Sequence, residues 1–165
     1  MQLRAEQIMR SPRTAQLLRS AAGHEVVYGT TGSGKTHWVK QLLADDEANG
    51  REVWVIDPIG GTSLPEWRDR AARFAKGVEE APALLAPLAA PVQRDATLRP
   101  ATLTIECANW VLDDSLCRAL VEQVLSEARG RDIRVRLIVN TLNLTSFGGS
   151  LTIRTSVLGN AQAVA

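Results

Sequence analysis

Long apolar runs are missing from this sequence of 165 residues. No uninterrupted apolar stretch is long enough to cross a bilayer, which takes about 20 consecutive apolar residues. The N-terminal residues carry interspersed charged side chains and lack the apolar core of a secretory signal peptide. We therefore expect no membrane segment and a cytoplasmic location.

The sequence also has few cysteines and no large excess of charge of one sign. Cys107 and Cys117 are too few for a disulfide framework and have no metal-ligand spacing, so we expect reduced thiols. The net charge of +1 neither indicates nor excludes a nucleic-acid partner, because a basic groove can lie on a neutral protein. The length and the hydrophobic content of 45% fit one globular domain with a proper core.

The most informative stretch has the spacing of a phosphate-binding P-loop. Its glycines let the backbone curl around an anion, with N–H groups and the positive end of a helix facing the phosphates. Lys35 is expected to reach the β- and γ-phosphates and the Thr36 hydroxyl to ligate Mg²⁺. An apolar strand precedes the loop and a helical pattern follows it, as the motif requires. We therefore predict an ATP and Mg²⁺ site formed by Gly29, Thr30, Thr31, Gly32, Ser33, Gly34, Lys35 and Thr36.

Strands and helices are expected to alternate along the rest of the chain. This pattern predicts an α/β fold, a three-layer α/β/α sandwich with a five-stranded, mainly parallel sheet. We expect a helical lead-in over residues 1–22 and an ATPase core over residues 23–165. Strands are predicted at about 24–29, 52–57, 98–106, 135–139 and 151–158, the last from its apolar–polar alternation. Helices are predicted at 2–20, 35–49, 65–76 (ending in a small strand near Arg73–Ala75), 78–93 with Pro82 in its first turn, and from Asp113 or Asp114 to Gly130.

Ligands of such sheets bind at the carboxyl ends of the strands. Glu106, at the tip of an apolar strand, is either the carboxylate that positions the attacking water or a solvated glutamate where the strand ends. Asn140 or Thr141 either senses the γ-phosphate or makes a strand-end hydrogen bond. Asp57 either supports the substrate loop and the metal's waters or caps the Pro58 turn. We assign catalytic roles to Glu106, Lys35 and Thr141, and a cofactor-binding role to Asp57.

Three further residues bear on hydrolysis. Ile105 stands where many such enzymes carry a Mg²⁺-associated aspartate, and its presence weakens metal positioning without abolishing nucleotide binding. Arg129 and Arg131 flank Gly130 at the end of a helix. They either stabilise charge at a neighbouring subunit's site, as arginine fingers do, or complement the helix dipole.

Four ordered segments of the chain resemble the FtsK/HerA superfamily of DNA-pumping ATPases. The P-loop is similar to the family's GTTGSGK(S/T) form. The segment Val55-Ile56-Asp57-Pro58-Ile59-Gly60-Gly61, followed by Pro65-Glu66-Trp67, resembles the "IDPKGG…PW" segment of actinobacterial FtsK/SpoIIIE-type and conjugal-transfer translocases. Ile105–Asn109 falls where the family has its Walker B segment. Ala128–Arg131 and the strand through Asn140-Thr141 fall where it has an arginine-bearing helix end and a sensor loop.

This resemblance implies a RecA-like core with strand order 5-1-4-3-2. It also implies self-association as a hexameric ring, and double-stranded DNA as the partner that ATP hydrolysis moves. Ile105, Ile59 and Leu142 depart from the family's aspartate, lysine and glutamine.

The leading hypothesis is a small DNA-translocase-type ATPase for DNA transfer, packaging or segregation. Its rival is a nucleotide-binding regulatory or assembly subunit with weak or no hydrolysis, which Ile105 and Leu142 favour. A small-molecule kinase would need an arginine-rich lid, and a GTPase an Asn-Lys-x-Asp motif after the fourth strand; neither is evident.

Overall fold

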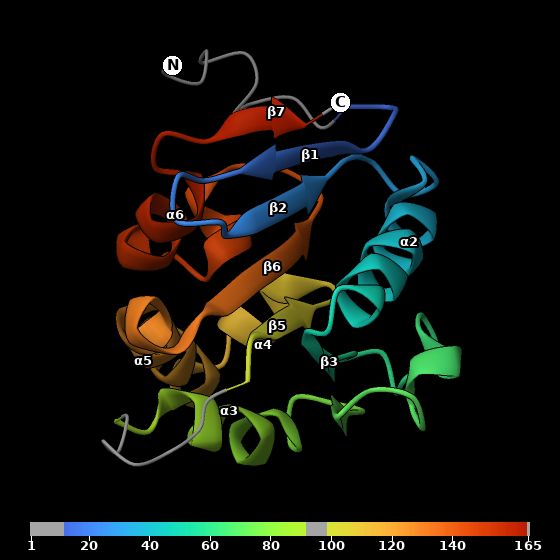
Figure 1. The fold of residues 1–165 in the computed structure, drawn as a ribbon. Helices are drawn as coiled ribbons and strands as arrows, with labels where there is room; N and C mark the ends of the chain where they lie inside the picture. Colours follow the sequence, from blue (N-terminus) through green and yellow to red (C-terminus); the bar gives the residue numbers. More distant parts are fainter. Residues whose placement is uncertain (1–11, 92–98, 165) are drawn as a thin grey trace.

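The computed structural model describes residues 12–91 and 99–164. They form a seven-stranded mixed sheet in the order β4-β3-β5-β6-β2-β1-β7 (Figure 1). The strands from β4 to β2 in this order are parallel, whereas β1 pairs antiparallel with β2 and with β7. The strands are β1 (Gln16–Arg19), β2 (Glu25–Tyr28), β3 (Glu52–Ile56), β4 (Arg73–Ala75), β5 (Ala101–Ile105), β6 (Ile133–Val139) and β7 (Gln162–Val164).

Helices cover both faces of the sheet (Figure 1). α2 (Lys35–Ala48) packs on one face, where Val39 and Leu43 join Val27 and Val55 in a buried cluster. The other face carries a larger cluster, formed with α3 (Ala81–Ala89), α4 (Ala108–Leu112), α5 (Ser115–Arg131) and α6 (Leu151–Leu158). Two short 3₁₀ helices, η1 (Pro65–Trp67) and η2 (Leu144–Phe147), lie in loops.

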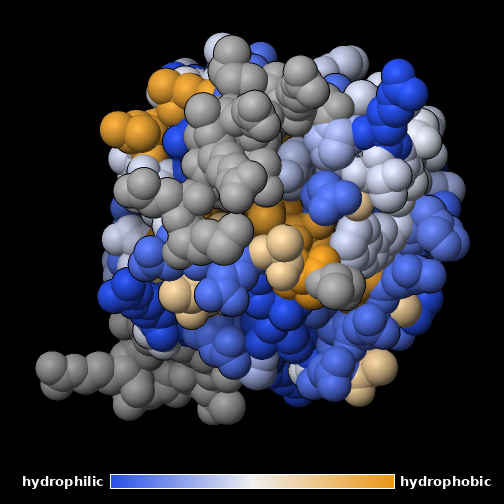
Figure 2. Space-filling model, turned by 90° about the horizontal axis from the view of Figure 1, so that it is seen from above, coloured by the Kyte–Doolittle hydropathy of each residue, from blue (hydrophilic) through white to orange (hydrophobic). Residues whose placement is uncertain are grey.

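The surface seen from above is shown in Figure 2. Its described part is mainly hydrophilic, with apolar side chains gathered near the centre and at the upper left. Among the helices of residues 12–91 and 99–164, none is long and apolar enough to span a membrane.

The predicted five-stranded parallel order is not matched, since the sheet has seven strands and residues 151–158 form α6. The other four predicted strands do lie in the predicted order, as the parallel neighbours β2-β6-β5-β3. The Ser150 hydroxyl caps this helix by accepting the Ile153 N–H at 3.1 Å. Ile153 and Val157 are fully buried, whereas Leu151 is 64% exposed. Because a spacing of four residues fits both a strand and a helix, Ile153 and Val157 alone do not distinguish the two.

The helix predicted over residues 2–20 is wrong where it can be compared, since residues 16–19 form β1. Leu17 and Leu18 pack into clusters on opposite faces of the sheet, which suits a strand with a neighbour on either side. Residues 2–11 lie outside the described part of the chain.

Other predicted boundaries are confirmed or shifted. The small strand at Arg73–Ala75 is confirmed, and α3 lies within the helix predicted over 78–93, with Pro82 in its first turn. The helix end predicted at Gly130 is wrong, because α5 continues to Arg131. Asp132, with φ of 47°, supplies the left-handed residue that ends it.

A buried ionic cluster joins α2 to the sheet. Arg136 of β6 is 1% exposed, and its guanidinium donates to Glu25 of β2 at 2.8 Å and to Asp46 of α2 at 2.9 Å. It also donates to the Thr104 hydroxyl of β5 at 3.3 Å. Burial alone raises the pKa of Glu25, but Arg136 and its neighbouring arginines hold it below its ordinary value. The cluster therefore fixes α2, the helix that follows the P-loop, against three strands.

Replacing Arg136 by Met should destabilise the fold, because buried Glu25 and Asp46 lose their shared partner. We expect the free energy of unfolding to fall by about 3–5 kcal/mol, measured by urea unfolding. Lys40→Met is the control, since the Lys40–Glu66 pair has both side chains at least 40% exposed and contributes little. Equal stability of the Arg136→Met and wild-type proteins would contradict this role for the cluster.

Candidate functional site

The parallel strands bring the predicted site residues to one edge of the sheet. The register pairs Tyr28 with Val139, and Ile105 with Leu137 and Ile56. The segments that follow β2, β6, β5 and β3 therefore leave the sheet side by side, in that order. They contain, respectively, the P-loop, Asn140-Thr141, Glu106 and Asp57, so the candidate site lies at the carboxyl edge of the strands.

The P-loop turns tightly from β2 into α2. Gly34, the N-cap of α2, has φ of 93°, a left-handed conformation that favours glycine. A Cβ on Gly29 would lie 2.5 Å from the Ser33 Oγ, so the loop closes on itself at this glycine. The Lys35 Nζ lies across the loop, donating to the carbonyl oxygens of Gly29 at 2.6 Å and Thr30 at 2.9 Å.

The segment before β1 braces the P-loop. The Thr30 N–H donates to the Pro12 carbonyl oxygen at 2.8 Å, and the Ala15 N–H donates to the Ser33 carbonyl oxygen at 3.0 Å. No sequence signal identifies these contacts, because they use main-chain atoms. Within the loop, Thr31, Gly32 and Gly34 are exposed, Gly29 is buried, and Thr30, Ser33, Lys35 and Thr36 are half-buried.

Lys35 and Thr36 are the first two residues of α2. They therefore lie at the positive end of the helix dipole, together with N–H groups that lack intrahelical partners. Burial lowers the pKa of Lys35, and the charge of Glu106 offsets this in part. Among residues 12–91 and 99–164, no group of three or more His, Cys, Asp or Glu side chains is arranged to hold a metal ion.

Glu106 follows β5 and is 4% exposed, so the alternative of a solvated glutamate is wrong. Its N–H donates to the Ile56 carbonyl oxygen at 2.9 Å, which extends the ladder between β5 and β3. Within the described residues its Oε2 is buried and has no hydrogen-bond partner. Burial and the charge of Asp57 raise the pKa of Glu106 to about 7, although Lys35 acts in the opposite direction. A carboxyl group that titrates near neutral pH suits a general base.

Asp57 is fully buried and holds its own loop. Its Oδ1 accepts the Ile59 N–H at 3.2 Å, and its Oδ2 accepts the N–H groups of Ser63 and Leu64, each at 3.0 Å. The carboxylate therefore reaches across residues 57–64, well beyond the Pro58 turn. This geometry supports the loop-holding interpretation, and the charge of Asp57 acts on Glu106 at the same time.

The segment after β6 contains the candidate sensor. The hydroxyls of Thr141 and Ser146 lie 2.9 Å apart, and the Asn143 N–H reaches the Thr141 Oγ1 at 3.4 Å. A groove of about 450 Å³ lies beside them. Its lining comes from α4, from the residue after it and from the segment after β6: Asn109, Asp113, Asn140, Thr145 and Ser146.

Two of the three residues that depart from the pattern of the resembled family lie in the core. Ile105 and Leu142 are fully buried in the larger hydrophobic cluster. Neither apolar side chain can ligate a metal or hydrogen-bond to a phosphate. Ile59, which stands in place of the family's lysine, is 38% exposed.

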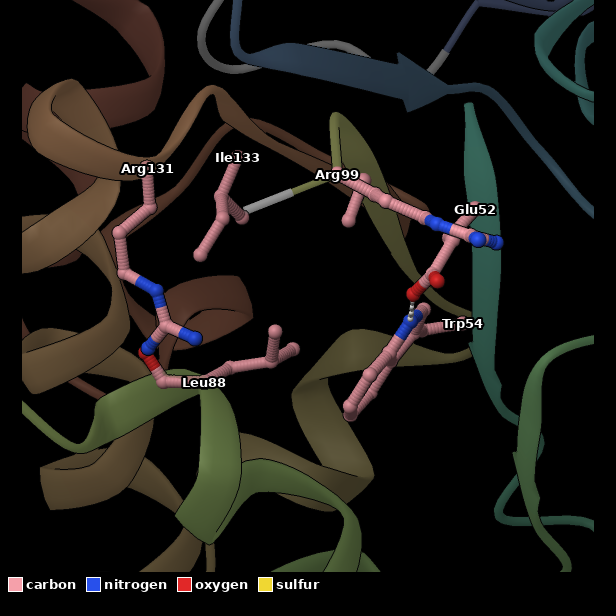
Figure 3. A pocket seen from close by; sticks show the side chains of 7 residues that line it. Glu52, Trp54, Leu88, Arg99, Arg131 and Ile133 are labelled. Atoms are coloured by element: carbon pink, nitrogen blue, oxygen red, sulfur yellow. Dashed lines mark hydrogen bonds between the residues drawn. The ribbon is translucent and has the colours of Figure 1, made fainter. Parts of the chain in front are cut away.

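Arg131 lies at the opposite, amino edge of the sheet. Its Nη1 donates to the carbonyl oxygens of Pro87, Leu88 and Ala90, each at about 3 Å, at the end of α3. It also lines a cavity of about 260 Å³ at the starts of β3, β5 and β6 (Figure 3). Glu52 and Trp54 stand on the opposite side of this cavity and hydrogen-bond to each other at 3.1 Å. Within its own chain Arg131 thus binds carbonyl groups at the end of α3, and its role at a neighbouring subunit's site stays a prediction.

The raised pKa of Glu106 implies that the stability of the fold depends on pH. The carboxyl group has a higher pKa in the folded chain, about 7, than its ordinary value of 4.5. Stability therefore falls as the pH rises from 4.5 to 7, because the folded state binds more protons. Glu106→Gln should stabilise the fold at pH 8, on the order of 2 kcal/mol, and much less at pH 5.

Urea unfolding at both pH values measures this difference. Glu79→Gln, at an exposed glutamate, is the matched control and should show no such pH dependence. An equal effect of Glu106→Gln on stability at pH 5 and pH 8 would contradict the raised pKa of this buried carboxyl group.

Comparison with known proteins identifies a similar fold. No family model matches the chain, and no curated protein matches it. The structure of the pCW3 conjugation coupling protein TcpA, in its monomer form with ATPγS, is similar, with a TM-score of 0.61 and 15% sequence identity. The match covers 94% of this chain and 55% of that one, so this chain spans about half the length of that protein. At this identity the likeness shows the fold alone: an α/β fold similar to that of a protein solved with an ATP analogue.

Proposed function

We propose that this chain is an ATP-binding and ATP-hydrolysing motor of the DNA-translocase type. The observation that carries the proposal is the position of Glu106. Its carboxyl group is buried, has one oxygen without a hydrogen-bond partner among the described residues, and lies at the same sheet edge as the P-loop residues Lys35 and Thr36. A phosphate cradle and a neighbouring carboxylate are the two elements that nucleotide hydrolysis needs from the protein.

Binding would use groups that the loop already presents. The N–H groups at the start of α2 would donate to the phosphates. Lys35 now donates to the carbonyl oxygens of Gly29 and Thr30, and would exchange these for the β- and γ-phosphates. The Thr36 hydroxyl would help to hold Mg²⁺, which neutralises phosphate charge when bound. Asp57 would keep the adjoining loop in place through its three backbone hydrogen bonds.

Hydrolysis would use Glu106 as the base. The carboxylate would orient a water molecule for attack on the γ-phosphorus and accept its proton as the bond to the β–γ bridging oxygen breaks. Its pKa of about 7 leaves a large ionised fraction at neutral pH and still allows it to take up a proton. Thr141, on the neighbouring segment, would contact the γ-phosphate.

The proposal of DNA as the substrate rests on the sequence resemblance to the FtsK/HerA superfamily. The fold is consistent with it, since the similar structure is that of a conjugation coupling protein. We also propose that six copies of the chain assemble into a ring, because that superfamily completes its sites between subunits.

A second function has specific support. Ile105 and Leu142 are fully buried apolar residues, where a hydrolysing family member carries an aspartate and a glutamine. A nucleotide-binding regulatory or assembly subunit would keep the P-loop without these groups. The two functions differ in whether Glu106 affects turnover.

Steady-state hydrolysis of ATP with Mg²⁺ tests the proposal. We expect wild-type turnover that double-stranded DNA stimulates and that falls by roughly 100-fold or more in Glu106→Gln, because the base is lost. Lys40→Gln, at an exposed ion pair further along α2, should leave turnover unchanged.

The outcome also decides between the two functions. Wild-type turnover no faster than that of Glu106→Gln would reject the motor and support the regulatory subunit. Turnover that depends on Glu106 but does not respond to DNA would reject the translocase part of the proposal alone.

A further inference from the structure

Two segments at the candidate site lie next to each other but are far apart in the sequence. One contains α4, whose N-cap, Cys107, directly follows Glu106. The other begins at Thr141 and contains η2. Because β6 lies between β2 and β5, this second segment leaves the sheet between the P-loop and Glu106.

Arg118 of α5 joins these two segments. Its Nη1 donates to the Leu112 carbonyl oxygen at 3.1 Å and to the Gly148 carbonyl oxygen at 3.2 Å. Leu112 is the last residue of α4 and Gly148 is the C-cap of η2. Carbonyl groups at helix ends lack intrahelical partners, so one guanidinium satisfies an orphan group on each element.

The packing around Arg118 is tight. A Cβ on Gly148 would overlap the Leu112 carbonyl oxygen, so the two backbones are as close as glycine allows. Leu112 and Phe147 are fully buried in the same hydrophobic cluster. The end of α4 and η2 therefore form one packed unit, with Arg118 across it.

Hydrogen bonds connect this unit to Thr141 and to Cys107, the residue that directly follows Glu106. The Ser146 hydroxyl of η2 lies 2.9 Å from the Thr141 hydroxyl. On the other side, the Cys107 carbonyl oxygen accepts the Trp110 N–H of α4 at 2.9 Å. The path from Glu106 to Thr141 is thus contiguous, through α4, Arg118 and η2.

We propose that Arg118 is a positioning residue that sets Glu106 and Thr141 relative to each other. The roles of those two residues rest on the proposed function. Hydrolysis requires the base and the γ-phosphate contact to be in place at the same time, and small displacements are costly. Nucleotide binding depends on the P-loop, to which Arg118 makes no hydrogen bond within the described residues.

Arg118→Met tests this role in the Mg²⁺-ATP hydrolysis assay. We expect kcat to fall roughly 10- to 100-fold and KM for ATP to change less than about twofold. Arg118→Lys, which keeps a donor and the charge, should recover part of kcat.

Arg51→Met is the matched control. Arg51 also donates to two carbonyl oxygens, those of Ala101 at 2.6 Å and Asp132 at 3.0 Å, but at the amino edge of the sheet. The Arg51→Met variant should be less stable than the wild type and should keep the wild-type kcat. A wild-type kcat in Arg118→Met, or an equal loss of kcat in Arg51→Met, would overturn the proposal.

Native-state hydrogen exchange separates this inference from the proposed function. In the wild type, the amides of residues 108–112 and 144–147 should exchange with one common free energy of opening. In Arg118→Met, the two segments should open with two different free energies. Independent opening in the wild type overturns the link, whether or not the chain hydrolyses ATP. Common opening in a chain without ATPase activity supports the link and rejects the proposed hydrolysis.

Discussion

The arrangement of the site depends on the buried guanidinium of Arg136. A charge removed from water must be paired, and the carboxylates of Glu25 and Asp46 meet this requirement from β2 and α2. The same ion pairs hold α2 at a fixed position on the sheet. Since α2 begins with Lys35 and Thr36, the position of the P-loop follows from an ionic cluster near the other end of the helix.

At the carboxyl edge of the sheet, the tightly turned P-loop lies beside two buried acidic side chains. Asp57 and Glu106 are both buried acids, but their carboxyl groups differ in how they are hydrogen-bonded. Asp57 accepts three backbone N–H groups, whereas Glu106 has one oxygen without a partner in the described part of the chain and a raised pKa of about 7. Lys35 is the cation whose charge acts on Glu106. A buried carboxyl group without a hydrogen-bond partner costs stability, and the catalytic role that we propose for Glu106 would explain why the chain tolerates it.

The sequence predicts those features that depend on local spacing. The P-loop, the helix after it and the acid at the end of β5 can each be read from a few consecutive residues. The strand predicted at 151–158 fails because Ile153 and Val157 fit both periods. The carboxylate partners of Arg136 are 111 and 90 residues away, and the Gly148 contact of Arg118 is 30 residues away, so no local pattern indicates them. The mixed edge of β1 and β7 is equally non-local, since it pairs the two ends of the described chain.

Nucleotide binding at the P-loop is the claim on which hydrolysis, DNA movement and the alternative regulatory role all depend. Titration calorimetry of wild type and Lys35→Ala with ATPγS and Mg²⁺ tests it most directly. We predict saturable binding of one nucleotide per chain by the wild type, and its loss in Lys35→Ala with the fold retained. A folded wild-type chain that binds no ATPγS, or equal affinity in both proteins, would contradict the assignment of this edge as a nucleotide site.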